Sequence, residues 1–412
     1  MKQETKRTLT PRLRFPEFRE PWGTQPLDSI ADRVTTRNAD ASVTRVLTNS
    51  AERGVLDQRD YFEKDIATPG KVDNYFTVNK GDYVYNPRVS ATAPVGPISR
   101  NNIGQGVMSP LYTVFRFQGK DTDFYEHYFH STGWHTYLRS ISSTGARHDR
   151  MSIGTAAFMR MPLPNPSHSE QRKIAACLGS LDEWIGAEGR KLEALRSHKK
   201  GLMQQLFPRP GESRPRLRFP EFHDAGEWEE TKASDWFTNR KTKGESGLPI
   251  YSVTMHDGMV RRDSFDRDFY DIEEASGNKK ACKGDIAYNM MRMWQGALGV
   301  VAEDCLVSPA YIVLAPKEST VPDFFACLFK LPSSLVLLTS HSRGLTKDRL
   351  RLYYEDFARI PLLVPSKAEQ QRIAACLSSL DAVLALQSRK VEALKQHKKG
   401  LMQQLFPSGP AI

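Results

Sequence analysis

The sequence predicts an α+β protein: two similar mixed α/β domains joined by two long antiparallel coiled-coil helices, with a pseudo-two-fold relation between the halves. Three observations predict this fold. A repeat covers most of the chain, two long segments carry apolar residues in a heptad pattern, and short β-rich runs precede each of those segments. The chain has 412 residues, which is enough for several domains.

The repeat is strongest in two segments, 170–208 and 369–407, which align without a gap and are identical at about two thirds of their positions. Fainter matches precede them, namely LRFPEF at 13–18 and 217–222, KGDYVYN at 80–86 with KGDIAYN at 283–289, and SPLYTV at 109–114 with SPAYIV at 308–313. Divergence is greatest in the domains before the helices. This divergence favours two domains that bind different ligands and are held by the same pair of helices. The alternative is neutral drift in loops around a common core.

The repeat and the apolar pattern divide the chain into six predicted segments. They are a first domain at 1–166, a first long helix at 167–207, a linker at 208–216, a second domain at 217–365, a second long helix at 366–407 and a tail at 408–412. Within the domains, we expect strands at Tyr83–Tyr85, Tyr112–Phe117 and Tyr311–Ala315 and helical stretches near Asp123–Leu138 and Pro322–Leu338. Each domain is therefore predicted as α+β with a twisted or partly closed sheet.

Each long helix carries an apolar stripe at alternating spacings of four and three, with two polar interruptions. Prolines bracket both helices, at 166 and 208 and at 365 and 407, as helix boundaries require. The predicted coiled-coil seam consists of Leu181, Ile185, Glu188, Leu192, Leu195, Lys199, Leu202 and Leu206 in the first helix and Leu380, Leu384, Gln387, Val391, Leu394, Lys398, Leu401 and Leu405 in the second.

An antiparallel register in which Leu181 faces Leu405 would also place the polar interruptions opposite each other, Glu188 against Lys398 and Lys199 against Gln387. A shift by one heptad would set each polar group against an aliphatic one, and burying an unpaired charge is costly. We therefore expect the polar residues to select this register. The alternative is that each helix packs on its own domain. A helix of about 38 residues spans about 57 Å, so a pair would be a stiff spacer.

The charge of the chain favours a polyanionic partner. Lys and Arg number 58 against 48 Asp and Glu, a formal net charge of +10. The five Cys are scattered without metal spacing, which fits a reducing compartment. No apolar signal core and no run of about 20 apolar residues occurs, so we expect a cytoplasmic protein with no membrane partner.

Basic and amide side chains gather near the turns of both domains, where double-stranded DNA is the expected ligand. Arg can bond bidentately to guanine and Asn to adenine, and Lys or Arg can hold phosphates; ordinary solvated surface charge is the alternative for any single residue. In the first domain these candidates are Arg33, Arg37, Arg45, Asn86, Arg88, Ser90, Arg147, His148 and Arg150. In the second they are Arg240, Lys241, Lys243, Asn289, Arg292, Trp294, Arg343, Lys347 and Arg349.

Motifs for catalysis and cofactor binding are missing from the sequence. It has no G-x-x-x-x-G-K-[ST] phosphate loop and no H-E-x-x-H or G-x-S-x-G motif. Residues 86–88, Asn-Pro-Arg, lack the second Pro and the aromatic residue of the amino-methyltransferase motif N-P-P-aromatic. We therefore expect no catalytic residue, no metal site and no cofactor in this chain.

These features together, the LRFPEF openings, the KGD-x-x-YN strands, the E-Q-x-x-I-A helix starts and the KKGLMQQLF helix ends, resemble the specificity subunit of type I restriction–modification systems over about residues 11–407. The resemblance implies that each domain is a target-recognition domain reading half of a bipartite, asymmetric DNA site. It also implies that the helices dock two methyltransferase subunits that use S-adenosylmethionine. Two restriction subunits that use ATP and Mg²⁺ would join them.

Two alternatives stay open at the level of sequence. One is a stand-alone DNA methyltransferase or nuclease, which would need a motif that the sequence lacks. The other is a protein-binding coiled-coil scaffold, which sequence-selective DNA binding would exclude.

Overall fold

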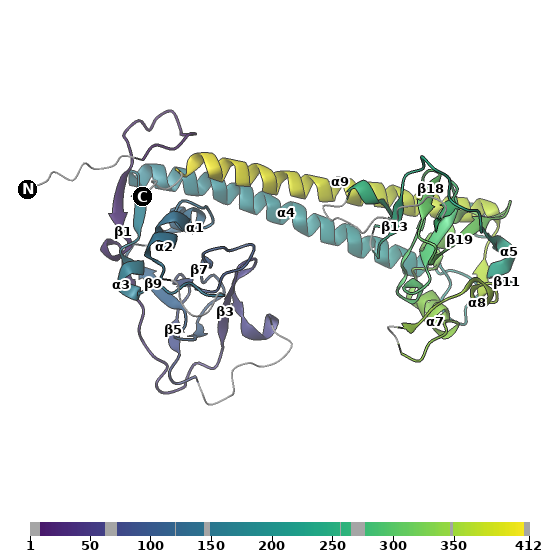
Figure 1. The fold of residues 1–412 in the computed structure, drawn as a ribbon, viewed down its shortest axis with the longest axis horizontal. Helices are drawn as coiled ribbons and strands as arrows, with labels where there is room; N and C mark the ends of the chain where they lie inside the picture. The colour runs from purple at the N-terminus through teal and green to yellow at the C-terminus, as the bar shows by residue number, and fades with distance from the viewer. Residues whose placement is uncertain are drawn as a thin grey trace, which may run out of the picture. The chain divides into compact units, whose positions relative to one another are not determined.

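A computed structural model describes residues 9–61, 72–119, 121–143, 149–255, 257–264, 277–346 and 349–407. The chain forms two compact units, 1–188 with 390–412 and 189–389 (Figure 1). Each unit therefore contains one mixed α/β domain, the first part of one long helix and the last part of the other. The division falls inside both helices, whereas the predicted segments end where the helices end.

The first domain is built on a four-stranded antiparallel sheet with the order β2-β9-β6-β7, accompanied by the strand pairs β1-β10, β3-β4 and β5-β8. Its elements are β1 (Gly23–Pro26), β2 (Ala31–Arg33), β3 (Leu47–Ser50), β4 (Gly54–Asp57), β5 (Phe76–Val78), β6 (Tyr83–Tyr85), β7 (Ile98–Arg100), β8 (Gly106–Met108), β9 (Thr113–Phe117), α1 (Asp123–Phe129), α2 (His135–Ile141), α3 (Thr155–Met159) and β10 (Pro162–Asn165).

The second domain repeats this topology strand for strand, with the sheet order β12-β19-β16-β17 and the pairs β11-β20, β13-β14 and β15-β18. Its elements are β11 (Glu229–Lys232), α5 (Ala233–Trp236), β12 (Phe237–Asn239), β13 (Tyr251–Val253), β14 (Met259–Arg261), β15 (Lys279–Ala281), β16 (Ile286–Asn289), β17 (Leu298–Val300), β18 (Cys305–Val307), β19 (Tyr311–Pro316), α6 (Pro322–Leu328), α7 (Pro332–Ser340), α8 (Tyr354–Phe357) and β20 (Pro361–Val364). The predicted helical stretches thus each form two short helices.

The KGD letters before β6 and β16 form a turn that the core requires. Gly81 and Gly284 have φ of 95° and 88°, a conformation that favours glycine. The Asp that follows is buried in both domains and accepts a bidentate bond from an arginine: Asp82 from Arg116 at 2.6 and 2.9 Å, and Asp285 from Arg240 at 2.6 and 3.1 Å. The motif therefore fixes the start of a central strand in each sheet.

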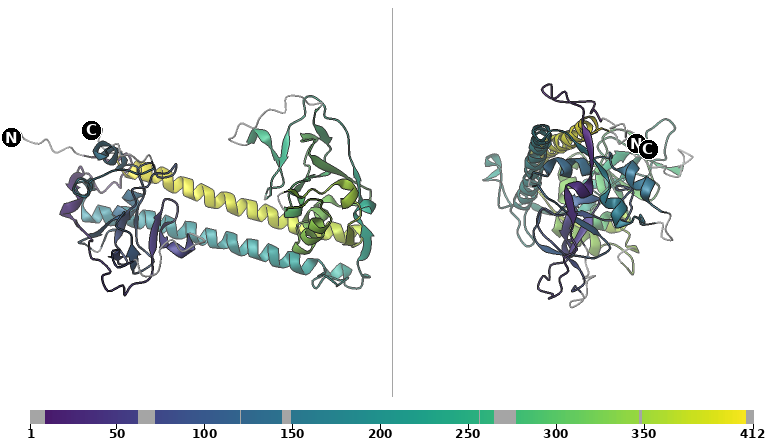
Figure 2. Two further views of the ribbon diagram at one scale, coloured as in Figure 1. Left: turned by 60° about the horizontal axis from the view of Figure 1, so that its bottom comes forward. Right: turned by 90° about the vertical axis from the view of Figure 1, so that its left-hand side faces the viewer.

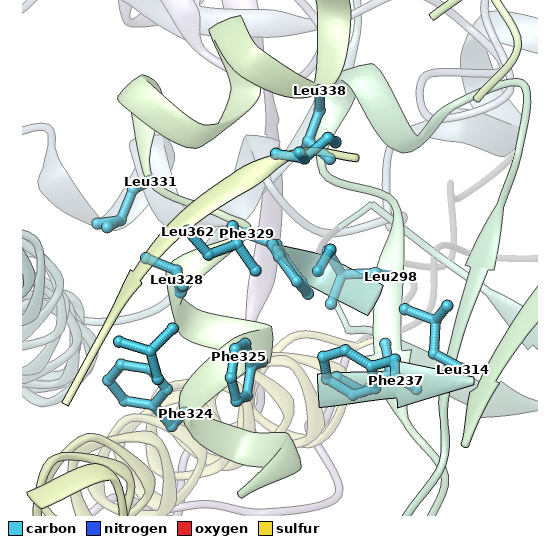
Figure 3. Close-up of a cluster of buried hydrophobic side chains, with 14 of the residues drawn as sticks. Phe237, Leu298, Leu314, Phe324, Phe325, Leu328, Phe329, Leu331, Leu338 and Leu362 are labelled. Atoms are coloured by element: carbon cyan, nitrogen blue, oxygen red, sulfur yellow. The ribbon is translucent and has the colours of Figure 1, made fainter. Parts of the chain in front are cut away.

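Aromatic and aliphatic side chains fill the core of each domain. In the second, the core includes Phe237 of β12, Leu298 of β17, Phe324 and Phe325 of α6, and Leu362 of β20 (Figure 3). The ring centroids of Phe324 and Phe325 lie 5.3 Å apart, edge to face. This packing holds α6 and α7 against the sheet, so the loops at the strand ends project from a rigid base.

The two long helices are α4 (His168–Leu206) and α9 (Lys367–Leu405), which lie next to each other in both views of Figure 2. In the first unit, Ile174 and Leu178 of α4 share a core cluster with Leu405 of α9. In the second unit, Leu206 shares one with Ile373. The start of each helix therefore packs on the end of the other, and the pair is antiparallel. Every residue of the predicted seam is buried or half-buried.

The expected register of the seam is wrong. Lys398 bonds to Asp182 at 2.5 and 2.6 Å rather than to Glu188, and Lys199 bonds to Asp381 rather than to Gln387. Glu188 instead accepts a bond from Lys390 at 2.5 Å. These partners correspond to a shift of about one heptad from the predicted register. Each seam lysine is paired because its side chain reaches an aspartate on the exposed flank of the other helix.

The LRFPEF segment joins the helix ends within each unit. Arg14 makes a bidentate ion pair with Glu170 at 2.7 and 2.8 Å, and the amide of Leu13 donates to the carbonyl of Gln404. The second copy does the same. Arg218 pairs with Glu369 at 2.8 and 2.7 Å, and the amide of Leu217 donates to the carbonyl of Gln205. One short segment thus connects the start of one helix to the end of the other.

Among the described residues, no single helix is long and apolar enough to cross a membrane. Only α6 and α7 taken together pass the length and composition test, and they meet at an angle of 83°.

Candidate nucleic-acid interface

Four of the predicted DNA-binding residues come together in the first domain. Asn86, Arg88, Ser90 and Arg150 line one cavity of about 570 Å³. Its remaining lining is rich in hydroxyl and amide groups from β3, from the segment after β4 and from the turn before β9, including Thr48, Asn49, Ser50, Tyr61 and Tyr112. A polar, open hollow that carries arginines at its rim can accept base edges or phosphates.

Backbone bonds build this site from two loops. The carbonyl of Pro87 accepts from the amide of Met151 at 2.8 Å, and the amide of Val89 donates to the carbonyl of Asp149 at 3.0 Å. Arg88 and Arg150 therefore lie opposite each other on paired segments. Arg88 is exposed and lies 4.0 Å from Asp149, a loose contact that leaves its guanidinium accessible.

Asn86 serves the loop itself. Its Oδ1 accepts from the amide of Arg88 at 3.0 Å and its Nδ2 donates to the carbonyl of Asn49 at 2.9 Å. Asn289 of the second domain bonds in the same way to the amide of Met291 at 3.0 Å. Both side chains shape the loop after the central strand, and Asn86 uses both its oxygen and its nitrogen within the fold.

The second domain brings five predicted residues onto two neighbouring loops. Asn289 is the last residue of β16, Arg292 and Trp294 follow it, and Arg343 and Arg349 lie between α7 and α8. The loops are joined where the amide of Leu352 donates to the carbonyl of Met290 at 2.9 Å. Trp294 Nε1 donates to the carbonyl of Met291 at 3.1 Å, which holds the half-buried indole in place.

The surroundings of the three arginines on these loops differ. Arg343 pairs with Asp356 at 2.6 Å, and this bond raises the pKa of its guanidinium. The Arg292 and Arg349 side chains are exposed. The two neighbouring loops of the second domain therefore carry exposed arginines together with Met291 and Trp294, whereas the matched place in the first domain is a hollow with hydroxyl and amide groups in its lining.

Six other predicted residues lie apart from these clusters. Arg240 bonds to the buried Asp285, which raises the pKa of Arg240 and engages its guanidinium within the domain. Arg37 donates to Asn74 and Arg45 to Asp57. The others, Arg33, Lys241 and Lys243, have exposed side chains and do not line the cavity. Arg147, His148 and Lys347 lie outside the described residues.

Sequence reasoning did not find the residues of β3 and the β3–β4 turn that line the cavity, such as Thr48 and Ser50. Small hydroxyl residues are common in turns, and nothing in the local sequence distinguishes these. Among the described residues, no group of three or more His, Cys, Asp or Glu side chains could hold a metal ion.

The fold defines a class of protein with two domains of one topology and unlike loops, each packed with the start of one long helix and the end of the other. Residues 231–396 match the family model "Type I restriction modification DNA specificity domain". A protein from Methanocaldococcus jannaschii, named as a type I restriction enzyme MjaX specificity subunit, is 24% identical over 282 residues. That match covers 63% of this chain and 61% of the relative's length.

Two solved structures have a similar fold. The specificity subunit of a type I restriction–modification system from M. genitalium matches with a TM-score of 0.56 and 14% identity over 98% of this chain and all of that chain. A chain from a study of complex assembly and conformational transition of a type I system matches with a TM-score of 0.54 and 15% identity, over 95% of this chain and all of that one.

The resemblance inferred from the sequence motifs is confirmed. The matching family model and the matching relative are both of type I restriction–modification specificity proteins, and the model covers residues 231–396, the larger part of the second unit.

Proposed function

We propose that the chain recognises a bipartite, asymmetric DNA sequence and directs partner methyltransferase and restriction subunits to it. The observation that carries the proposal is the pairing of identical topology with unlike reading loops. The strand order is the same in both domains, yet Arg88, Ser90 and Arg150 line a hollow in one, while Arg292 is exposed beside the half-buried Trp294 on the matched loop of the other. Two different readers on one frame fit two different half-sites.

The exposed arginines can supply both contacts to bases and contacts to phosphates. Guanidinium groups at a loop tip can bond to guanine edges or hold phosphates, and phosphate contacts fix position without reading sequence. The net charge of +10 supports association with a polyanion. We infer that the protein works on double-stranded DNA in the cytoplasm.

The partners would bring the chemistry. Two methyltransferase subunits with S-adenosylmethionine and two restriction subunits with ATP and Mg²⁺ complete the proposed complex. Exposed apolar side chains on the long helices support a docking role. Trp184 of α4 and Val383 of α9 are matched positions of the repeat, 48% and 44% exposed, and Leu386 is 60% exposed. Large exposed apolar groups on an otherwise polar helix are typical of interaction surfaces.

The docking role is tested by replacing Trp184 with Glu. We expect at least about tenfold weaker association of the methyltransferase subunit, because buried Trp side chains carry much of the energy of interfaces. Lys191→Glu, at an exposed position of the same helix, is the control. Equal association of both variants would contradict the docking role.

Mapping methyladenine across the genome tests recognition. Cells with the methyltransferase subunit should show one bipartite methylated motif only when this chain is present. A motif that persists without the chain, or methyl transfer and DNA cutting by the purified chain alone, would contradict the proposal. Equal affinity for all duplexes would favour a protein-binding scaffold instead.

A further inference from the structure

One apolar side chain of the second domain has no packing role. Leu345, in the loop between α7 and α8, is 100% exposed. A fully exposed leucine makes no apolar contact within its own fold and contributes nothing to the core. It is also the most exposed of the large apolar side chains among the described residues.

The loop that carries Leu345 is closed tightly at its base. The amide of Arg343 donates to the carbonyl of Arg351 at 2.9 Å, and the reverse bond is also 2.9 Å. A Cβ on Gly344 would lie 2.6 Å from the carbonyl oxygen of Arg349, so only glycine fits there. The ion pair between Arg343 and Asp356 anchors the same base at 2.6 Å. Leu345 therefore follows a backbone that is held on both sides.

The surroundings of Leu345 are basic. Arg343, Arg349 and Arg351 are exposed on the same loop. The neighbouring loop, joined through the bond from Leu352 to Met290, presents exposed Arg292 and Met291, the latter 41% exposed. An exposed leucine on a loop with exposed arginines suits a ligand whose outer groups are anionic and whose inner groups are apolar. DNA has this character, because phosphates flank base faces and thymine methyl groups.

We propose that Leu345 is a specificity-determining residue that packs on an apolar surface of a base in the half-site read by the second domain. The inference rests on the proposed function and adds the chemistry of one contact. Two base surfaces offer this chemistry: the 5-methyl group of thymine and the face of a partly unstacked base. The matched loop of the first domain has Ala146 in place of Leu345, so the contact belongs to one half-site only.

The test uses the full chain assembled with its methyltransferase subunit and a library of random duplexes, from which bound sequences are enriched and read. The wild type is compared with Leu345→Ala, with Leu345→Met as the conservative change. Val336→Ala is the control, because Val336 is 69% exposed on α7 of the same domain and loses a similar apolar side chain.

In Leu345→Ala we expect a loss of about tenfold in preference at one or two positions of one half-site. The other half-site should be unchanged, Leu345→Met should retain most of the preference, and Val336→Ala should behave as wild type. Unchanged preference in Leu345→Ala, or an equal loss on all duplexes, would overturn the inference while leaving the proposed function intact. A wild type that enriches no sequence would overturn both.

Modified duplexes carrying the enriched site identify the base surface. Deoxyuridine in place of thymine should weaken wild-type binding, and not that of Leu345→Ala, if the methyl group is the contact. If a base face is the contact, 2-aminopurine at the affected position should brighten with the wild type alone. A wild type that responds to neither substitution would overturn the inference.

Discussion

At the scale of single residues, the short repeated motifs supply the partners of buried ion pairs. The Arg and Glu that recur in LRFPEF and E-Q-x-x-I-A meet as Arg14 with Glu170 and as Arg218 with Glu369, and both carboxylates are 1% exposed. A carboxylate at this depth needs a charged and hydrogen-bonded partner. The motif residues therefore hold each domain to the ends of the long helices.

The ion pair of the second unit gives a stability prediction. Arg218→Met should lower the free energy of unfolding by about 3–5 kcal/mol, because Glu369 would be left buried without its partner. Urea denaturation measures the change. Arg214→Met, at an exposed position of the preceding segment, is the control and should shift stability by no more than about 0.5 kcal/mol. Arg218→Met combined with Glu369→Leu should recover part of the loss, and no recovery would argue against charge burial as the cause.

Buried histidines predict a loss of stability in mild acid. Burial lowers the pKa of His127, which also faces Lys398, Asp182, His130 and Glu126, and burial lowers the pKa of His135 to about 4. The folded state therefore keeps these rings neutral while the unfolded chain protonates them near its ordinary pKa of about 6.5. Their contribution is complete above that pH and is lost as pH falls from about 6.5 towards 4.

The acid effect is measured by thermal unfolding between pH 7 and 5. His127→Gln should flatten the decline in stability over this range, because one protonation linked to unfolding is removed. His198→Gln, at an exposed position of α4, should leave the slope as in the wild type. Identical slopes for both variants would show that His127 is not linked to unfolding.

At the scale of elements, the seam shows what a heptad pattern can and cannot predict. The stripe itself identified the covered face of α4 and α9. The predicted register was wrong because it matched only the residues at seam positions with one another. A lysine side chain is long enough to reach a carboxylate beside the seam, and Asp182 and Asp381 accept these bonds. Polar seam residues then place little constraint on which heptads face each other.

The register predicts which charges are coupled. In a double-mutant cycle, Lys398→Ala with Asp182→Ala should show an interaction of about 0.5–1 kcal/mol, as expected for a partly exposed ion pair. Lys398→Ala with Glu188→Ala should show a smaller one, because Glu188 bonds to Lys390. A larger coupling to Glu188 than to Asp182 would restore the register expected from the sequence.

At the scale of the whole molecule, the repeat gives each unit the same composition: a domain, the start of one helix and the end of the other. The two sheets have the same strand order because the residues that fill them match, as Tyr83 and Tyr288 do at the centre. In the proposed function this common plan serves two unlike half-sites, and the length of the helices sets how far apart they are read.

Lengthening both helices tests that role. Seven residues inserted into α4 and seven at the matched place in α9 should increase half-site separation by about 10 Å, or about three base pairs, because each helical residue adds about 1.5 Å. The half-site sequences should stay the same, as methyladenine mapping would show. An insertion in α4 alone is the control and should abolish methylation, since the two helices would differ in length and their ends would no longer meet. New half-site bases after the paired insertion would contradict the spacer role.

The sequence alone predicted the repeat and the length and covered face of the helices, because these follow from periodicity and identity along the chain and need no knowledge of contacts. Its motifs also gave the resemblance to type I specificity subunits. Tertiary structure decided which side chains meet. It placed Arg88 and Arg150 at one hollow, committed Arg240 and Asn86 to the fold, and left Leu345 without a partner. The physical reason is that the sequence does not show whether an arginine has a buried aspartate or only water as its neighbour. That neighbour is brought close only when the chain folds.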